Sequence, residues 1–191
     1  MAQVTWTGAR VSPEERRARE LEVLAGLEGR LRERVRGQEH VHRAISRHLL
    51  RQAAGVREAR RRPLLTALFA GPTGTGKTET AKALAEALGR PLLVYDMGNY
   101  HDVYTVAALV GAPPGYIGSD RPGRLVTDVQ RAPNAVLLFD EIEKAHPQLW
   151  DPFLAVFDEG RLVELSQGLQ ADFTETIIVM TTNLLQREAL Q

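Results

Sequence analysis

A glycine-rich segment between an apolar run and a helical pattern constrains the fold of this chain more than any other feature. The apolar run covers residues 64–70, and the segment after it consists of Gly71, Pro72, Thr73, Gly74, Thr75, Gly76, Lys77 and Thr78. This is a full match to the pattern G-x-x-x-x-G-K-[ST] in the order strand, loop, helix. The glycines let the backbone curl so that successive N–H groups point inward, at the positive end of the following helix. The segment therefore predicts a phosphate-binding loop rather than a chance glycine turn.

The lysine and threonine that end this segment indicate which ligand the loop binds. Lys77 supplies a positive charge for the β and γ phosphates of a nucleotide, and the Thr78 hydroxyl is placed to coordinate Mg²⁺. Glu79, the next residue, is counted with the nucleotide-binding candidates. The predicted ligands are therefore ATP or ADP together with Mg²⁺.

A second apolar run ends in two adjacent acids. Residues 136–139 are apolar, and Asp140 and Glu141 follow them. The carboxyl ends of strands are where open α/β sheets bind ligands. Because successive side chains of an extended chain alternate in direction, we expect Asp140 to hold the magnesium ion and Glu141 to face a water molecule beyond the γ-phosphate. Alone, such a strand end is as typical of a surface turn, but beside a phosphate loop it indicates nucleotide hydrolysis.

A polar residue also follows the last apolar run, residues 176–181. An asparagine in the position of Asn183 commonly caps a helix or forms a turn. The alternative is that its amide hydrogen-bonds to the γ-phosphate or to the attacking water. That alternative adds Asn183 to Glu141 and Lys77 as a catalytic candidate.

Short apolar runs separated by helical patterns predict the fold class. The runs cover residues 64–70, 92–95, 135–139 and 176–181. Strands that alternate with helices are typical of a mostly parallel sheet covered by helices on both faces. We therefore predict a three-layer α/β/α domain.

The first sixty or so residues have a helical pattern throughout. Ser12 and Glu15 form the capping-box pattern of a helix start, and we expect this helix to reach about Arg34, with a second helix after it. We expect one structural domain made of two segments. These are a helical lead-in with the adenine side, residues 1–62, and a core, residues 63–191.

His40 and His42, on the second predicted helix, suggest a metal pair at first sight. Residues two apart on a helix point to different sides, so we expect no shared ligand. Both side chains are expected on the surface.

Composition argues against several classes of function. Lysine and arginine together number 24, as do aspartate and glutamate, so no net charge draws the whole chain to nucleic acid or to an acidic membrane. The absence of cysteine rules out disulfides, thiolate catalysis and cysteine-bound zinc. No segment approaches the roughly twenty apolar residues that cross a bilayer. We predict a soluble, cytoplasmic protein with no nucleic-acid or membrane partner.

Together these motifs resemble those of the AAA+ ATPases. The phosphate loop corresponds to Walker A, the strand that ends in Asp140 and Glu141 to Walker B, and Asn183 to sensor 1. The segments 109–118 and 139–147 resemble, more narrowly, the second ATPase module of the Clp unfoldases and disaggregases. The resemblance covers nearly the whole chain. It implies a homo-hexameric ring that uses ATP hydrolysis to unfold polypeptides, and it favours the catalytic interpretation of Asn183.

The resemblance also implies two further binding segments. The channel-lining loop of the family, whose tyrosine grips an extended polypeptide, corresponds to Gly115, Tyr116, Ile117 and Gly118. An aromatic ring on a glycine-flanked loop offers a sequence-tolerant apolar contact, which suits that role. The segment beside which the family binds adenine corresponds to Val35, Arg36, Gly37 and Gln38. A second channel loop corresponds to residues 166–173, where residues 168–171 depart from the family pattern.

The given sequence ends eight residues beyond Asn183. In the family, the arginine finger, the sensor 2 arginine, the helical lid and the peptidase-docking loop lie beyond that point. We therefore expect this chain to lack the lid and to have weak or no ATP turnover alone, and a peptidase partner is left open. Two other functions also stay open: a nucleotide-gated assembly scaffold, and an AAA+ protein that remodels nucleic acid, against which the neutral charge argues.

Overall fold

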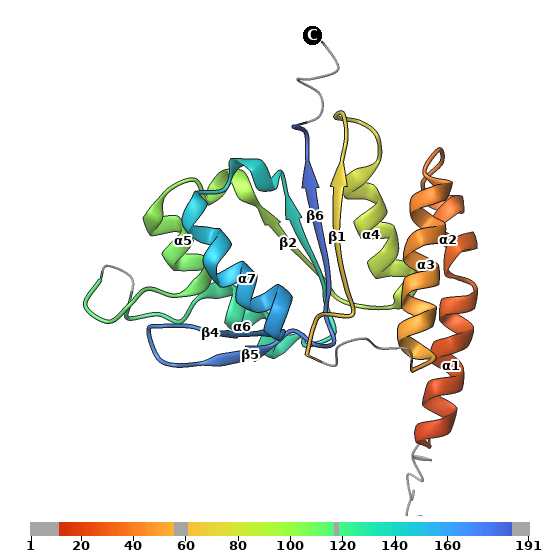
Figure 1. The fold of residues 1–191 in the computed structure, drawn as a ribbon, viewed down its shortest axis with the longest axis horizontal. Helices are drawn as coiled ribbons and strands as arrows, with labels where there is room; N and C mark the ends of the chain where they lie inside the picture. The colour runs from red at the N-terminus through yellow and green to blue at the C-terminus, as the bar shows by residue number, and fades with distance from the viewer. Residues whose placement is uncertain (1–11, 56–60, 117–118, 185–191) are drawn as a thin grey trace, which may run out of the picture.

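The computed structural model, which describes residues 12–55, 61–116 and 119–184, confirms the predicted three-layer α/β/α fold (Figure 1). Its central layer is a parallel sheet with strand order β1, β6, β3, β2. The strands are β1 (Leu65–Ala70), β2 (Leu92–Asp96), β3 (Val136–Asp140) and β6 (Ile177–Thr182). Each predicted apolar run begins and ends within one residue of its strand.

Helices cover both faces of this sheet (Figure 1). One face is covered by α1 (Pro13–Ala25), α2 (Leu27–Arg34), α3 (Glu39–Ala53) and α4 (Lys77–Leu88). The other is covered by α5 (Val103–Val110), α6 (Arg124–Arg131), α7 (Trp150–Glu159) and an antiparallel hairpin of β4 (Arg161–Val163) and β5 (Gln170–Asp172). Short 3₁₀ turns occur at Met97–Asn99, Ile142–Lys144 and Pro147–Leu149.

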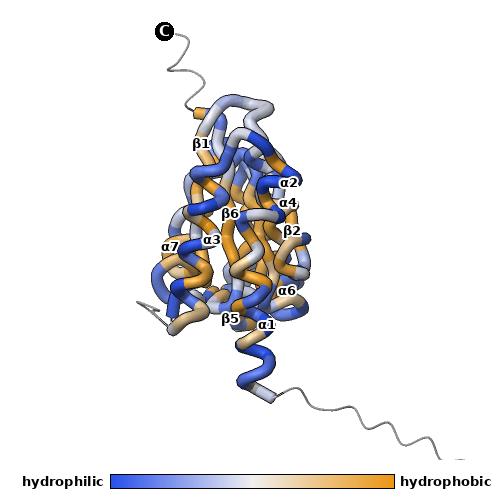
Figure 2. The backbone as a smooth tube through the Cα atoms, turned by 90° about the vertical axis from the view of Figure 1, so that its right-hand side faces the viewer, coloured by the Kyte–Doolittle hydropathy of each residue, from blue (hydrophilic) through white to orange (hydrophobic). Residues whose placement is uncertain are grey.

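Alternate side chains of each strand face the two helical layers. In β3, Leu137 and Phe139 pack in the same buried cluster as residues of α5, α6 and α7. Val136 and Leu138 pack instead with residues of α2, α3 and α4. Figure 2 shows the central strands as hydrophobic segments inside the molecule. Burial on both faces explains why the sequence has continuous apolar runs rather than alternating ones.

The N-terminal helix is shorter than predicted. Its capping box is confirmed, because Ser12 Oγ accepts a hydrogen bond from Glu15 N at 3.1 Å and Ser12 N donates to the Glu15 carboxylate at 2.8 Å. However, α1 ends at Ala25 and α2 begins at Leu27. The prediction of one helix to Arg34 is therefore wrong. The break falls at the intervening glycine, a residue that weakens a helix interior.

The division into a lead-in over residues 1–62 and a core over residues 63–191 stays a prediction. Leu27 and Leu31 of α2 and Ile45 of α3 lie in the same buried cluster as Val136 and Val179 of the sheet. The lead-in helices are thus packed directly against one face of the sheet.

None of the described helices has the length and hydrophobicity that spanning a bilayer requires.

His42 is buried, which contradicts the prediction that both histidines lie on the surface; His40 is exposed as predicted. In the described part of the chain, neither ring nitrogen of His42 has a hydrogen-bond partner. Burial lowers the pKa of His42, and Arg32 and His40 add to this effect, whereas Glu39 and Glu28 oppose it. The buried ring is therefore held in its neutral form.

We expect this histidine to make the fold sensitive to acid. Because the pKa of His42 is lower in the folded state than its unfolded value of about 6.5, stability is lost as the pH falls below that value. His42→Leu should raise the free energy of unfolding by about 1–2 kcal/mol near pH 5, and by less near pH 7. Urea unfolding at both pH values measures this. His40→Leu is the control, and an equal pH dependence in all three proteins would contradict the prediction.

Candidate functional site

The candidate site lies at the edge of the sheet where β1, β3 and β6 end (Figure 1). Parallel strands bring their carboxyl ends to one edge, and the segments after these three strands contain the predicted phosphate-site residues. The segments surround a cavity of about 420 Å³. The lining comes from the glycine-rich loop, from α4 and from the ends of β3 and β6: Thr73, Gly74, Gly76, Lys77, Thr78, Glu79, Lys82, Asp140, Glu141, Thr181 and Asn183.

The glycine-rich loop joins β1 to α4. Gly74 and Gly76 have φ angles of 82° and 88°, a left-handed conformation that other residues rarely adopt. A Cβ atom on Gly76 would lie 3.0 Å from Cγ1 of Val35, so close packing is a second reason for glycine there. Helix α4 begins at Lys77, which places its positive end at the loop. This geometry favours the binding of phosphate groups.

Lys77 is held by three oxygen atoms. Its Nζ donates hydrogen bonds to Gly71 O at 2.7 Å, to Pro72 O at 2.8 Å and to Asn183 Oδ1 at 2.8 Å. All three acceptors are neutral, so these contacts orient the ammonium group without neutralising it. Its positive charge remains for an anion in the cavity.

Asp140 contacts two threonine hydroxyls. Thr78 Oγ1 lies 3.0 Å from Asp140 Oδ1, and Thr181 Oγ1 donates to the same oxygen at 2.5 Å. Thr181 also accepts a hydrogen bond from Glu141 N at 2.9 Å. The sequence prediction missed Thr181. A polar residue near the end of an otherwise apolar strand could have identified it as a candidate site residue. It positions both acids because β6 is paired with β3.

Glu141 lies in an unusual backbone conformation. Its φ and ψ are 58° and 53°, and among the described residues it alone has a positive φ without being glycine. Its Oε1 accepts from Asn183 Nδ2 at 3.0 Å, and its Oε2 is paired with Lys144 Nζ. The two acids do point in different directions, as expected, but strand alternation is not the reason. The strand ends at Asp140, and the left-handed residue after it turns the second carboxylate away.

Lys144 is a second functional candidate that the sequence prediction missed. The hydrogen bond and the charge of Glu141 raise the pKa of Lys144, so the lysine is positively charged beside the carboxylate. The backbone N–H of Asn183 donates to Glu143 Oε1 at 3.0 Å, which fixes the chain after β6. The turn after β3 thus positions Glu141 and Asn183 together.

The proposed adenine segment contacts the glycine-rich loop. Val35 is buried against Gly76, and Gln38 Nε2 donates to Thr75 O at 3.1 Å. Gly37 has a φ of 80° in the turn between α2 and α3, and Arg36 is exposed.

Glu79, in the first turn of α4, lines the cavity. Its Oε1 accepts from Arg34 Nε at 3.0 Å, so this carboxylate is shared with the end of α2. The α2–α3 region therefore borders the site on the side of α4.

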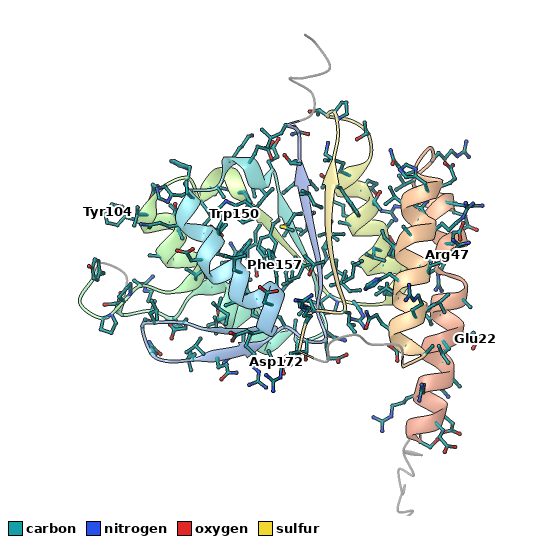
Figure 3. All side chains as sticks on the ribbon, in the orientation of Figure 1. Glu22, Arg47, Tyr104, Trp150, Phe157 and Asp172 are labelled. Atoms are coloured by element: carbon teal, nitrogen blue, oxygen red, sulfur yellow. The ribbon has the colours of Figure 1, made fainter. Side chains whose placement is uncertain are left out.

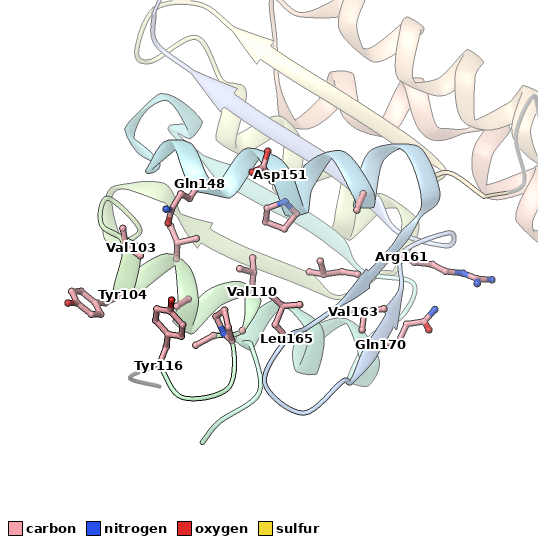
Figure 4. Close-up of a pocket in the computed structure, with 18 of the residues that line it drawn as sticks. Val103, Tyr104, Val110, Tyr116, Gln148, Asp151, Arg161, Val163, Leu165 and Gln170 are labelled. Carbon is pink, nitrogen blue, oxygen red and sulfur yellow. The ribbon is translucent and has the colours of Figure 1, made fainter. Parts of the chain in front are cut away.

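The predicted polypeptide-binding loop lies apart from the phosphate site. Tyr116 is 71% exposed, and Gly115 has a φ of 88°, whereas Ile117 and Gly118 lie outside the described residues. Tyr116 lines a separate, largely apolar groove of about 900 Å³ between α5, α7 and the β4–β5 hairpin (Figure 4). Tyr104 of α5, which is 69% exposed, lines the same groove (Figure 4) and lies at the edge of the molecule farthest from α1–α3 (Figure 3).

Two residues of the predicted phosphate site fit the requirements of a magnesium ion. Among the described residues, no three histidine, aspartate or glutamate side chains gather to hold a metal by themselves. Magnesium commonly takes only one or two protein ligands when phosphates supply others. Thr78 Oγ1 and Asp140 Oδ1, 3.0 Å apart beside the glycine-rich loop, fit this requirement.

We expect Thr181→Val to weaken binding of the Mg²⁺–ADP complex about tenfold, because valine keeps the volume but leaves Asp140 and the Glu141 N–H without their shared partner. Isothermal titration with Mg²⁺ and with EDTA measures this, and binding of metal-free ADP should change less. Thr182→Val is the control, because its hydroxyl accepts from Leu184 N and does not contact Asp140. Equal affinities for the two variants would argue against the role of Thr181.

The chain is similar in sequence to a known protein family and to several known proteins. Residues 62–191 match the model of the family described as AAA domain (Cdc48 subfamily). "Chaperone protein ClpB" of Aquifex aeolicus is 45% identical over 182 residues, which is 94% of this chain and 18% of that protein. The proteins of the same name from Corynebacterium diphtheriae and Rickettsia felis are 48% and 47% identical over 168 residues, 86% of this chain and 20% and 19% of theirs.

The chain thus spans about a fifth of the length of these relatives. The family match covers the glycine-rich loop, the acid pair and Asn183, and it confirms the resemblance to the Clp-type AAA+ ATPases. This chain belongs to the AAA domain family, Cdc48 subfamily.

Proposed function

We propose that this chain binds ATP with Mg²⁺ and hydrolyses it, and that hydrolysis drives the unfolding or disaggregation of polypeptides. The observation that supports ATP hydrolysis best is the continuous hydrogen-bonded network from Lys77 through Asn183 to Glu141, beside the pair of Thr78 and Asp140. It joins a phosphate-binding charge, a polar sensor and a carboxylate at one cavity. These are the groups that transfer of a phosphoryl group to water requires.

Each residue has a separate role in the proposed reaction. The loop N–H groups and Lys77 bind the phosphates, and the uncompensated charge of Lys77 stabilises the β and γ groups. Thr78 and Asp140 would hold Mg²⁺, which when bound supplies positive charge to the phosphate oxygens. Residues 35–38 contact adenine, and Glu79 borders the nucleotide.

Glu141 is the proposed group that orients and deprotonates the attacking water. Both of its carboxylate oxygens are engaged here, one by Asn183 and the other by Lys144. Each oxygen keeps a further acceptor site, through which Glu141 can receive the proton of the attacking water. Asn183, which contacts both Glu141 and Lys77, is placed to respond to the γ-phosphate.

The proposed substrate is an unfolded or aggregated polypeptide that passes Tyr116 in a ring of six copies. Support comes from the exposed tyrosine beside an apolar groove and from the chaperone name of the relatives. An arginine from outside the described residues would complete the site, so slow turnover by this chain alone stays a prediction. A peptidase partner and a cytoplasmic location also stay predictions.

The second candidate function is a nucleotide-gated assembly scaffold that binds ATP without turnover. The contacts of Glu141 with Asn183 and Lys144 favour it, because they occupy one acceptor site on each carboxylate oxygen and compete with a water molecule for the same group. A nucleic-acid remodeller is less well supported, since the chain has equal numbers of basic and acidic residues.

Glu141→Gln separates the motor from the scaffold. The amide cannot accept the proton of the attacking water, so we expect ATP hydrolysis by the assembled protein to fall about a hundredfold or more while ATP binding is kept. Steady-state phosphate release and equilibrium binding measure the two effects. Glu159→Gln, an exposed position on α7, is the control of equal charge change. If both variants hydrolysed ATP at the wild-type rate, Glu141 would not be the activating group.

Tyr116→Ala tests the polypeptide contact. Since Tyr116 does not line the phosphate cavity, basal ATP hydrolysis should stay within about twofold of wild type, while unfolding of a tagged fluorescent substrate should be lost. Tyr104→Ala, which removes an equally exposed ring from the same groove, should retain unfolding. Wild-type unfolding by Tyr116→Ala would remove the proposed gripping role.

A further inference from the structure

A buried carboxylate lies at the point where the β4–β5 hairpin meets the loop that carries Tyr116. Glu164, directly after β4, is 1% exposed. No ion pair within the described residues involves it. A buried carboxylate without a cation is costly unless hydrogen bonds satisfy it, so its surroundings must supply them.

Four donors from the hairpin satisfy this carboxylate. Oε1 accepts from Gln167 N at 2.8 Å and from Leu169 N at 3.2 Å. Oε2 accepts from Ser166 N at 2.9 Å and from the Ser166 hydroxyl. Burial alone would raise the pKa of Glu164, but these hydrogen bonds outweigh burial and lower it. The ionised side chain therefore fixes the turn of the hairpin.

The same carboxylate packs against the base of the Tyr116 loop, residues 111–116 and 119–123. A Cβ atom on Gly111 would lie 2.6 Å from Glu164 Oε2, and Gly111 has a φ of 99°. A Cβ atom on Gly123 would lie 2.5 Å from Gly111 N, so the two ends of the loop meet there. A side chain at either glycine would clash with its neighbours, so both positions need glycine. Glu164 lies directly beside the point where the two ends of the loop meet.

Two contacts join the hairpin to the far arm of the loop. Gln167 Nε2 donates to Asp120 O at 3.4 Å, and the Ser166 hydroxyl, whose single proton is donated to Glu164, lies 3.2 Å from Arg121 O. Leu165 of the hairpin and Tyr116 both line the apolar groove (Figure 4). Ser166 and Gln167, which hold the loop, are thus the residues whose backbone N–H groups Glu164 binds.

We propose that Glu164 is a positioning residue that fastens the β4–β5 hairpin to the base of the Tyr116 loop, so that the two segments move as one unit. Its consequence for polypeptide binding rests on the proposed function. Both oxygens of Glu164 act as acceptors, whereas glutamine offers one acceptor and turns an NH₂ group toward N–H donors. Glu164→Gln keeps the shape of the side chain and should release the hairpin from the loop.

Spin labels test this fastening directly, because the chain has no cysteine and two can be introduced. Arg47, exposed on α3 on the far side of the sheet, serves as the reference (Figure 3). Distances are measured from Arg47→Cys to Tyr116→Cys and, in a second protein, to Leu165→Cys. In Glu164→Gln both distance distributions should become about twofold wider, while circular dichroism is unchanged. Wild-type widths in either pair would overturn the proposal.

Two further variants complete the test. Glu159→Gln, on the opposite wall of the groove, makes the same charge change and should leave both widths unchanged; widening by this variant would show that charge alone acts, against the proposal. If Glu164→Gln does not fold, Ser166→Ala decides, because it removes the hydroxyl that donates to Glu164 and packs against Arg121 O. It should widen both distributions by a smaller factor, and unchanged widths would overturn the proposal.

A functional measurement separates this inference from the proposed function. In the assembled protein, Glu164→Gln should raise the polypeptide concentration that half-stimulates ATP hydrolysis about threefold or more, with the KM for ATP unchanged. If polypeptide does not stimulate the wild-type protein, the proposed function fails, while the spin-label distances still decide whether Glu164 fastens the hairpin. If the half-stimulating polypeptide concentration and the KM for ATP rose by the same factor, the result would contradict a role of Glu164 in positioning.

Discussion

The position of β6 between β1 and β3 is the constraint on which the site depends. The glycine-rich loop follows β1 and the acid pair lies at the end of β3, and these strands are not neighbours in the sheet. Thr78 contacts Asp140 directly, and further contacts between the two motifs run through residues at the end of the intervening strand. Asn183 accepts from Lys77 on one side and donates to Glu141 on the other, and Thr181 holds Asp140. Strand order therefore turns two local motifs into one polar network.

The left-handed conformation of Glu141 shows how that network is maintained. Such a conformation costs a non-glycine residue about 1–2 kcal/mol and persists where surrounding contacts determine it. Here the backbone N–H is held by Thr181, and the carboxylate by Asn183 and Lys144. The same contacts that stabilise the turn also occupy the group proposed to activate water. Under the proposed function, a nucleotide-dependent movement of Asn183 would alter both the turn after β3 and the surroundings of Glu141.

The parts that could be predicted from the sequence depend on local patterns. The strand bounds are close because both faces of the sheet are buried, and the turn between β1 and α4 depends on backbone geometry that its glycines allow. Features set by tertiary pairing were not predictable. Thr181 faces Asp140 through strand register, and Glu164 lies against Gly111 through packing of distant segments. The burial of His42 depends likewise on how α3 packs, and strands of three residues, β4 and β5, are too short to show alternation.

The most direct test of the central claim is a crystal structure of the protein with Mg²⁺ and a non-hydrolysable ATP analogue. The account predicts that the phosphates lie against the N–H groups of residues 73–78, with Lys77 Nζ on their oxygens and the metal ion between Thr78 and Asp140. A nucleotide bound elsewhere, or a metal ion that neither Thr78 nor Asp140 contacts, would contradict it.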